Sequence, residues 1–228
     1  MRMKIEEKRE RSRKQIMAAS LELFYEKGYQ RTTTRDIIAK AGILNGSLYN
    51  RFKSKEEILL SIVTEALERT LDKCEDILRE EKNPLIAAVL PSALEISVSS
   101  KDRKAADLIY EVHRQWSAVD RYNEMNIEWF SKYLDKFGID FAETEDLELK
   151  MLTFLGAIGN VCGHYANGGQ GDCNKILRYI TSYVSTLLGI PVMNMDRTIQ
   201  RLTEIIDENE MKLLVDEDCT DIIPKERF

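Results

Sequence analysis

The chain has 228 residues, of which 43% are hydrophobic and 32% charged, and its formal net charge is −6. The charged N-terminal stretch lacks the apolar core of a secretory signal. No run reaches the roughly 20 apolar residues that a membrane span needs. These features favour a globular, cytoplasmic protein over a secreted or membrane-spanning one.

Positive charge is concentrated at the N-terminal end of the chain. Residues 1–55 contain fourteen Lys and Arg against six Asp and Glu, a net charge of +8. Since the whole chain carries −6, residues 56–228 carry −14. Nucleic-acid binding depends on local cation density and not on a basic chain as a whole. The charge pattern predicts that residues 1–55 bind nucleic acid, although a charge run can also be a solvated helix face.

Two short helices with a glycine turn between them are predicted inside this basic segment. Thr33 can cap the first helix, with Asp36 in the capping-box position three residues later. Gly42 ends it, because glycine accepts the positive φ of a sharp helix exit. A second helix is predicted over about residues 45–52, with Leu48 on its core side. This is the layout of a helix-turn-helix, in which the second helix enters the DNA major groove.

Residues 10–60 resemble the TetR family of bacterial transcriptional regulators. The positions that match the family pattern directly in this segment are Thr32, Thr33, Ile37, Ala41, Gly42, Gly46, Leu48, Tyr49, Phe52 and Lys55. The resemblance implies an all-α fold, with an N-terminal three-helix helix-turn-helix DNA-binding domain (residues 1–55) and a C-terminal helical ligand-binding and dimerisation domain (residues 56–228). It also implies a homodimeric regulator, most often a repressor, that a small molecule releases from an inverted-repeat operator.

The expected DNA contacts follow from the same resemblance. They are Thr33, Thr34, Arg35, Asn45, Gly46, Ser47, Tyr49, Asn50, Arg51 and Lys55. Tyr49 and Lys55 are assigned to phosphates, and the other polar residues of the second helix to the groove. Leu44 stands where the family usually has Ser, so Asn45 could itself be the N-cap and start the helix one residue later. Arg51 replaces His or Tyr, so the family's preferred DNA sequence cannot be transferred.

The rest of the chain is predicted to be helical. Asn83-Pro84 and Gly138 mark helix ends, and Pro91 is expected to kink the helix that contains it. The first long helix joins both predicted domains and can act as a rigid lever. The loop Gly168–Gly171 lacks a preceding strand and a phosphate-binding lysine, so we interpret it as a turn. The predicted helices cover residues 55–80, 84–99, 101–118, 121–137, 145–167, 172–188 and 196–214.

The helices at 145–167 and 172–188 are the predicted dimer interface. Small residues on an apolar helix permit close approach of a partner helix, and members of the TetR family dimerise through their last two main helices. The interface residues are Gly156, Ala157, Gly159, Asn160, Tyr179 and Tyr183. The alternative is that the small residues only serve packing within one chain.

Aromatic residues and a histidine in the C-terminal part form a candidate ligand pocket. The predicted wall consists of Tyr110, His113, Trp116, Trp129, Tyr133 and Phe154. Aromatic walls with a few polar groups suit a small-molecule site, and the TetR resemblance implies a cavity in this domain. The alternative is that these side chains fill the core.

Catalysis, cofactors and metals have little support, and we predict no enzyme, cofactor or metal site. Cys162 and His164 form one weak pair, and Cys173 lies beyond a glycine-rich loop. The four cysteines are scattered and fit reduced thiols: Cys74, Cys162, Cys173 and Cys219. Besides a ligand-responsive repressor, the sequence leaves open a DNA-binding regulator without a ligand, and a thiol- or metal-responsive switch.

Overall fold

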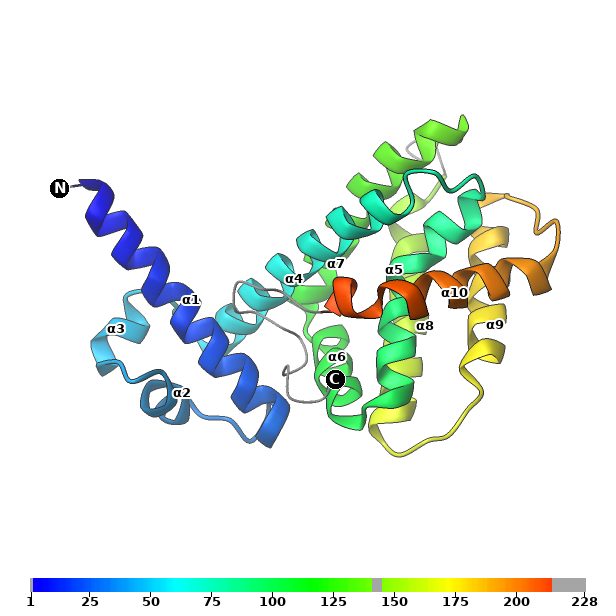
Figure 1. Ribbon diagram of the computed structural model, residues 1–228. Helices are drawn as coiled ribbons and strands as arrows, with labels where there is room; N and C mark the ends of the chain where they lie inside the picture. Colours follow the sequence, from blue (N-terminus) through cyan, green and yellow to red (C-terminus); the bar gives the residue numbers. More distant parts are fainter. Residues whose placement is uncertain (1, 141–144, 215–228) are drawn as a thin grey trace. The chain divides into compact units, whose positions relative to one another are not determined.

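The computed structural model describes residues 2–140 and 145–214, and each regular element in these ranges is a helix (Figure 1). The predicted all-α class is confirmed. The helices are α1 (Arg2–Lys27), α2 (Thr34–Ala41), α3 (Asn45–Tyr49), α4 (Lys55–Ile77), α5 (Pro84–Lys101), α6 (Arg103–Arg114), α7 (Trp116–Leu134), the 3-10 helix η1 (Asp135–Phe137), α8 (Leu147–Ala166), α9 (Cys173–Leu188) and α10 (Met195–Leu214). None of those helices is long and apolar enough to cross a membrane.

The chain divides into two compact units within α4. The first unit ends at Ala66, and the second spans Leu67–Leu213. The predicted domain boundary after residue 55 coincides with the start of α4, whereas the first unit also includes the first half of this helix. A single continuous helix therefore belongs to both units.

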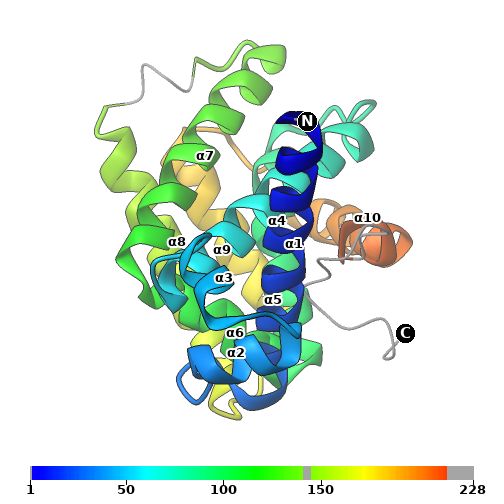
Figure 2. The same cartoon turned by 90° about the vertical axis from the view of Figure 1, so that its left-hand side faces the viewer.

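The first unit is built around the apolar face of α1. Figures 1 and 2 both show α2 and α3 beside this helix. The buried side chains come from all four helices and the segment after α3: Ile16, Met17, Phe24, Ile37, Leu48, Phe52, Ile58 and Leu59. The Gln15 side-chain amide donates to the carbonyl of Ala41 at 2.7 Å, which fixes the end of α2 against α1. This small core sets the orientation of α3.

The second unit is centred on α5, which is buried along most of its length, from Leu85 to Ser99. Asn83 caps α5, since its side chain accepts from the N–H of Leu85, and Pro84 occupies the first turn as predicted. The helix also contains Pro91. Such an apolar helix belongs at the middle of a helical bundle, because it has no polar face to expose.

Two glycines allow α8 to pack closely on α6. A β-carbon at Gly159 would lie 2.6 Å from the Cβ of His113, and one at Gly163 would lie 2.6 Å from the ring of Tyr110. Real side chains do not approach to such distances, so both positions require glycine while the helices keep this spacing. The small residues of α8 thus include two that pack within the chain.

The boundary between α6 and α7 differs from the prediction. A single helix was expected over residues 101–118, but α6 ends at Arg114 and α7 begins at Trp116. Gln115 between them is extended, with φ −90° and ψ 110°. Neither glycine nor proline marks this break, and Gln is a good helix former. Local propensity therefore gave no signal for it.

Candidate nucleic-acid interface

The start and end of α2 have the predicted geometry. The Thr33 hydroxyl accepts from the N–H of Asp36 at 3.2 Å, and the Asp36 carboxylate accepts from the N–H of Thr33 at 2.9 Å. The predicted capping box is confirmed. Gly42 has φ +62° and ends α2 in the left-handed region, also as predicted. The hydrogen bond from Lys27 and those from Thr33 lower the pKa of Asp36 to about 2.

The recognition helix α3 is short and has no side-chain cap. It begins at Asn45, with Leu44 in the N-cap position, and ends at Tyr49. The alternative in which Asn45 caps a helix that starts one residue later is therefore wrong. The predicted extent to Phe52 is also too long, because residues 50–54 form turns and a bend.

The exposed surface of this segment contains most of the predicted groove contacts. Leu48 is fully buried and anchors α3 to the core. Asn45, Gly46 and Asn50 are exposed, as is Tyr49, at 53%. Ser47 is half-buried. A polar and aromatic surface over one buried leucine gives a short helix a face that can enter a groove.

Thr34 and Arg35 lie on the first turn of α2, and Thr33 precedes them. Thr33 and Arg35 are exposed, and Thr34 is half-buried. The Thr33 hydroxyl is already engaged by Asp36. Arg35 is the cation of this group, and it has no salt bridge or hydrogen bond among the described residues.

Lys55 does not occupy the outward position expected of a phosphate contact. Its ammonium group donates to the carbonyls of Tyr29 at 2.8 Å and Thr32 at 3.0 Å. It also lies 4.1 Å from the centre of the Tyr29 ring. Lys55 therefore ties the first turn of α4 to the loop between α1 and α2. Its role in the structure is to position the helix-turn-helix.

Arg51 lies beyond the end of α3 and is half-buried. One guanidinium nitrogen, Nη1, donates to the carbonyl of Asn50 at 3.1 Å. Its Nε is buried and has no hydrogen-bond partner in the described part of the chain. A contact with a base would require this side chain to leave the Asn50 carbonyl.

Two exposed residues at this surface were absent from the predicted contacts. Lys53 is exposed, two residues before the inward-facing Lys55. Leu44 is 80% exposed at the start of α3, and an apolar side chain there can meet a thymine methyl group. The sequence signal for Leu44 was its departure from the family's serine. For Lys53 the sequence gave no separate signal, because the family pattern assigned the phosphate contact to Lys55.

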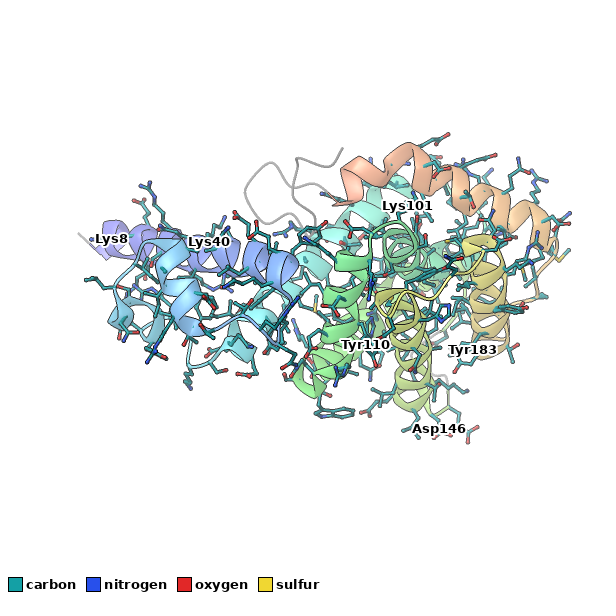
Figure 3. All side chains as sticks on the ribbon, turned by 90° about the horizontal axis from the view of Figure 1, so that it is seen from below. Lys8, Lys40, Lys101, Tyr110, Asp146 and Tyr183 are labelled. Atoms are coloured by element: carbon teal, nitrogen blue, oxygen red, sulfur yellow. The ribbon has the colours of Figure 1, made fainter. Side chains whose placement is uncertain are left out.

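The other cations of the first unit fall into paired and free groups. Lys40 pairs with Glu22 and Glu26, Lys27 with Asp36, and Arg13 with Glu65. The paired side chains hold helices together. Those that are exposed on α1, without an ion-pair partner among the described residues, are Lys8 (labelled in Figure 3), Arg9, Arg11 and Lys14. Together with Arg35 and Lys53 they supply free positive charge for phosphates.

The predicted ligand residues do not surround one common pocket. Trp129 stacks on Tyr133 with ring centres 4.9 Å apart, and the Tyr133 hydroxyl donates to the carbonyl of Leu78 at 2.6 Å. Trp116 is 68% exposed. It lies about 25 Å from Tyr133 along α7, at 1.5 Å per residue. Trp116 is therefore far from the stacked pair and does not wall an enclosed site with it.

The remaining three ligand candidates have other neighbours. Tyr110 (labelled in Figure 3) packs over Gly163. The Nε2 of His113 lies 3.0 Å from a carboxylate oxygen of Glu95. Phe154 lines a cavity of only about 10 Å³ together with six other apolar residues of α5, α7, α8 and α9. Close packing of this kind fits the alternative in which these side chains fill the core.

The predicted dimer residues divide between the surface and the interior. Gly156 and Asn160 are exposed on α8, and Ala157 is half-buried. On α9, Tyr179 is 73% exposed, and Tyr183, which is labelled in Figure 3, is 38% exposed. Gly159 is buried against His113 within the chain. The expectation that Gly159 faces a partner subunit therefore conflicts with its position, because α6 of the same chain already covers it.

Cys74 and Cys162 are buried in the core, and Cys173 is half-buried. Burial raises the pKa of Cys74 and of Cys162 to about 12, so both thiols stay protonated at neutral pH. Burial also raises the pKa of Cys173. Cys219 lies outside the described residues. Within residues 2–140 and 145–214 there is no group of three His, Cys, Asp or Glu side chains arranged to hold a metal ion.

Comparison with known proteins shows a family similarity in the N-terminal part of the chain. A model of the family described as "Bacterial regulatory proteins, tetR family" matches residues 16–62, which include α2, α3 and the start of α4. Over these residues the chain is similar to the TetR family. The predicted resemblance is thus confirmed.

Relatives within the TetR family share mainly this domain. The chain is 36% identical over 73 residues to the HTH-type transcriptional repressor KstR2 of Mycolicibacterium smegmatis, which covers 32% of this chain and 36% of the repressor. It is 28% identical over 112 residues to the fatty acid metabolism regulator protein of Bacillus subtilis, or 49% of this chain and 57% of the relative. The match thus spans about a third to somewhat over half the length of these relatives.

The fold as a whole is shared with solved TetR-family structures. One of them is Thermus thermophilus FadR, a TetR-family transcriptional repressor in complex with lauroyl-CoA. It aligns with a TM-score of 0.58 and 19% identity, over 80% of this chain and 96% of that one. At such low identity the alignment shows a common fold only. Any ligand of this chain must be inferred from its own residues.

Proposed function

We propose that this protein is a DNA-binding transcriptional repressor of the TetR family that a small molecule releases from an inverted-repeat operator. The observation that carries the proposal is the exposed polar surface of α3 on a capped helix-turn-helix, with unpaired cations nearby. The 36% identity over 73 residues to the HTH-type transcriptional repressor KstR2 supports the proposal. The proposed place of action is the cytoplasm, because an operator lies there.

In the proposed complex, α3 enters the major groove. Asn45 and Asn50 are suited to adenine, because a carboxamide can bond two edge atoms of that base. Tyr49 contacts phosphate, and Lys53 takes the phosphate role that Lys55 was expected to have. The Arg51 guanidinium reaches a base or phosphate after it leaves the carbonyl of Asn50.

The proposed active form is a homodimer that associates through α8 and α9. Gly156 and Asn160 on α8 form a small polar strip, and no atom lies within 4 Å of a β-carbon built at Gly156. Tyr179 and Tyr183 on α9 add aromatic surface, and Leu149 on α8 is 61% exposed. Exposed aromatic and apolar groups on two neighbouring helices suit a helix-packed interface. Gly159 is not part of this proposed interface.

The first effectors to test are fatty acyl-CoA thioesters. The Thermus thermophilus repressor of the same fold is described in complex with lauroyl-CoA, and a relative is named as a fatty acid metabolism regulator. A regulator without a ligand remains the competing hypothesis. A thiol switch has no support from Cys74 or Cys162, because both thiols are buried and protonated.

A gel-shift assay with DNA upstream of the protein's own gene tests the proposal. The wild type should retard a fragment that contains an inverted repeat, and lauroyl-CoA should release it. Asn45→Ala with Asn50→Ala should abolish specific retardation, because both side chains face outward and neither supports the core. Asn174→Ala, an exposed amide on α9, is the matched control. Equal binding by the double variant and the control would exclude α3 as the reading helix.

A further inference from the structure

We infer that the effector binds in an open groove beside α10, as an anionic group attached to an aliphatic chain. This inference rests on the proposed function. The site, which we name the α10 groove, has a volume of about 780 Å³. Residues 81–86, residues 190–194 except Val192, and one side of α10 from Arg197 to Glu204 form its lining. This volume lies within the range of small-molecule sites, about 300–1,000 Å³.

Polar contacts hold the walls of the α10 groove together. The Asn83 amide donates to the Thr198 hydroxyl at 3.3 Å, which links the start of α5 to α10. Arg201 Nε lies 3.4 Å from the Glu81 carboxylate on the opposite wall. Arg201 also approaches Glu204 at 3.7 Å. The two acids that line the groove therefore share one arginine.

Two cations of the groove remain available for a ligand. Lys82 and Arg197 are exposed and have no ion-pair partner among the described side chains. The lining thus carries an excess of positive charge, in a part of the chain, residues 56–228, whose formal net charge is −14. Carboxylate and phosphate groups match this arrangement, since arginine binds both with charge-assisted, often bidentate hydrogen bonds.

An apolar surface lies beside these cations. Met193 is 92% exposed, and Ile190, Pro191 and Pro84 also line the groove. A methionine side chain is flexible and polarizable, so it adapts to an aliphatic partner. Cation and apolar surface together select an amphipathic anion over an inorganic ion or a purely apolar compound. A fatty acid carboxylate and the phosphates of a fatty acyl-CoA share this chemistry.

The groove also offers a route from ligand to DNA. The Glu81 carboxylate accepts from the N–H groups of Lys82 and Asn83, both at 2.9 Å, and so organises the turn between α4 and α5. An anion that draws Arg201 away from Glu81 changes the interactions of this turn. Because α4 is one helix that begins in the DNA-binding unit, a change at its far end can shift the population of DNA-competent states.

Titration calorimetry with the full chain tests the site. The probes are lauroyl-CoA, laurate and coenzyme A alone, which separate thioester, free acid and head group as the source of the anion. Lys82→Gln with Arg197→Gln should weaken binding of the best probe by about tenfold or more, because two charge-assisted hydrogen bonds are lost. Met193→Glu should weaken it as well. Lys175→Gln, which removes an exposed cation of α9 outside the groove, should leave affinity unchanged.

Two results would overturn the inference. One is equal affinity of the double variant and Lys175→Gln for a probe that the wild type binds. The other is failure of all three probes to bind wild type. Light scattering on Met193→Glu adds a check, since a loss of dimer mass would make the groove an interface between copies. Operator binding without ligand is measured separately on wild type and the same variants. If wild type does not bind the operator, the proposed function is refuted. If wild type binds the operator and the groove variants keep full ligand affinity, only the groove is refuted.

Discussion

Lys53 and Lys55 are two positions apart and have different environments. Lys53 is exposed to solvent, whereas the Lys55 ammonium group is held by the carbonyls of Tyr29 and Thr32. We expect Lys53→Gln to weaken binding to all DNA sequences about equally and to reduce the salt slope of log K by about 1. It should leave the melting temperature unchanged, because only the backbone N–H of Lys53 is hydrogen-bonded, to Glu57, and its ammonium group has no such contact among the described residues.

Lys55→Gln is the matched variant and should behave in the opposite way. It removes two hydrogen bonds from a charged donor, so we expect the first unit to lose about 2 kcal/mol of unfolding free energy. Chemical denaturation and a salt titration of DNA affinity measure the two effects. A reduced salt slope with unchanged stability in Lys55→Gln would return this residue to the phosphate contacts.

Asp36 makes the stability of the first unit depend on pH. Its pKa is lowered from 3.8 to about 2, first by the hydrogen bond from Lys27 and then by those from Thr33. A carboxyl with a lowered pKa stabilises the fold above its unfolded-state value and loses this effect as pH falls toward its folded-state value. The melting temperature of wild type should therefore exceed that of Asp36→Asn at pH 6, and the gap should narrow between about pH 4 and pH 2. A gap that is constant over this range would contradict the role of the ionised carboxylate.

The sequence correctly predicted the roles of single residues where those roles depend on neighbours close in the chain. Thr33, Asp36 and Gly42 form a cap and an exit that involve only adjacent residues. The direction of Lys55 depends on carbonyls of the loop before α2, far back in the chain. The resemblance to the family supplied an outward role for it, and only the packed unit shows the inward one.

Gly156 and Gly159 lie on the same helix, α8, and substitutions at the two positions should have different effects. Gly159→Ala places a methyl group against His113, so we expect a loss of about 1–3 kcal/mol in unfolding free energy from overpacking. Gly156→Arg meets open space in the monomer and should leave the fold intact while it blocks a partner helix. Thermal unfolding and light scattering separate the two variants. A stable dimer of Gly156→Arg would place the interface elsewhere.

The presence of a helix was easier to predict from the sequence than the residues at which it begins and ends. Helix α9 begins at Cys173 after the cap Asp172 and ends before Gly189, close to the predicted residues 172–188. Both ends have strong local signals. The break at Gln115 has none, and α3 is shorter than its polar and apolar pattern suggested. Both boundaries lack a glycine or proline that would mark them in the sequence.

For the whole molecule, the proposed ligand site was the least predictable feature. The aromatic residues chosen from the sequence are spread along α6, α7 and α8, and several pack tightly against one another or against the backbone. The α10 groove is instead formed by segments more than one hundred residues apart, near Glu81 and near Arg201. Periodicity identifies apolar faces, but it cannot show which distant loops enclose a hollow.

Selection of DNA from a random-sequence pool by the purified full chain tests whether α3 reads DNA as part of a two-fold dimer. A two-fold dimer presents two α3 helices to major grooves about one helical turn, or about 34 Å, apart. We predict enrichment of an inverted repeat whose half-sites have this spacing, and loss of that enrichment in the Asn45→Ala, Asn50→Ala variant. Enrichment of single, unpaired half-sites, or of no sequence at all, would contradict this prediction.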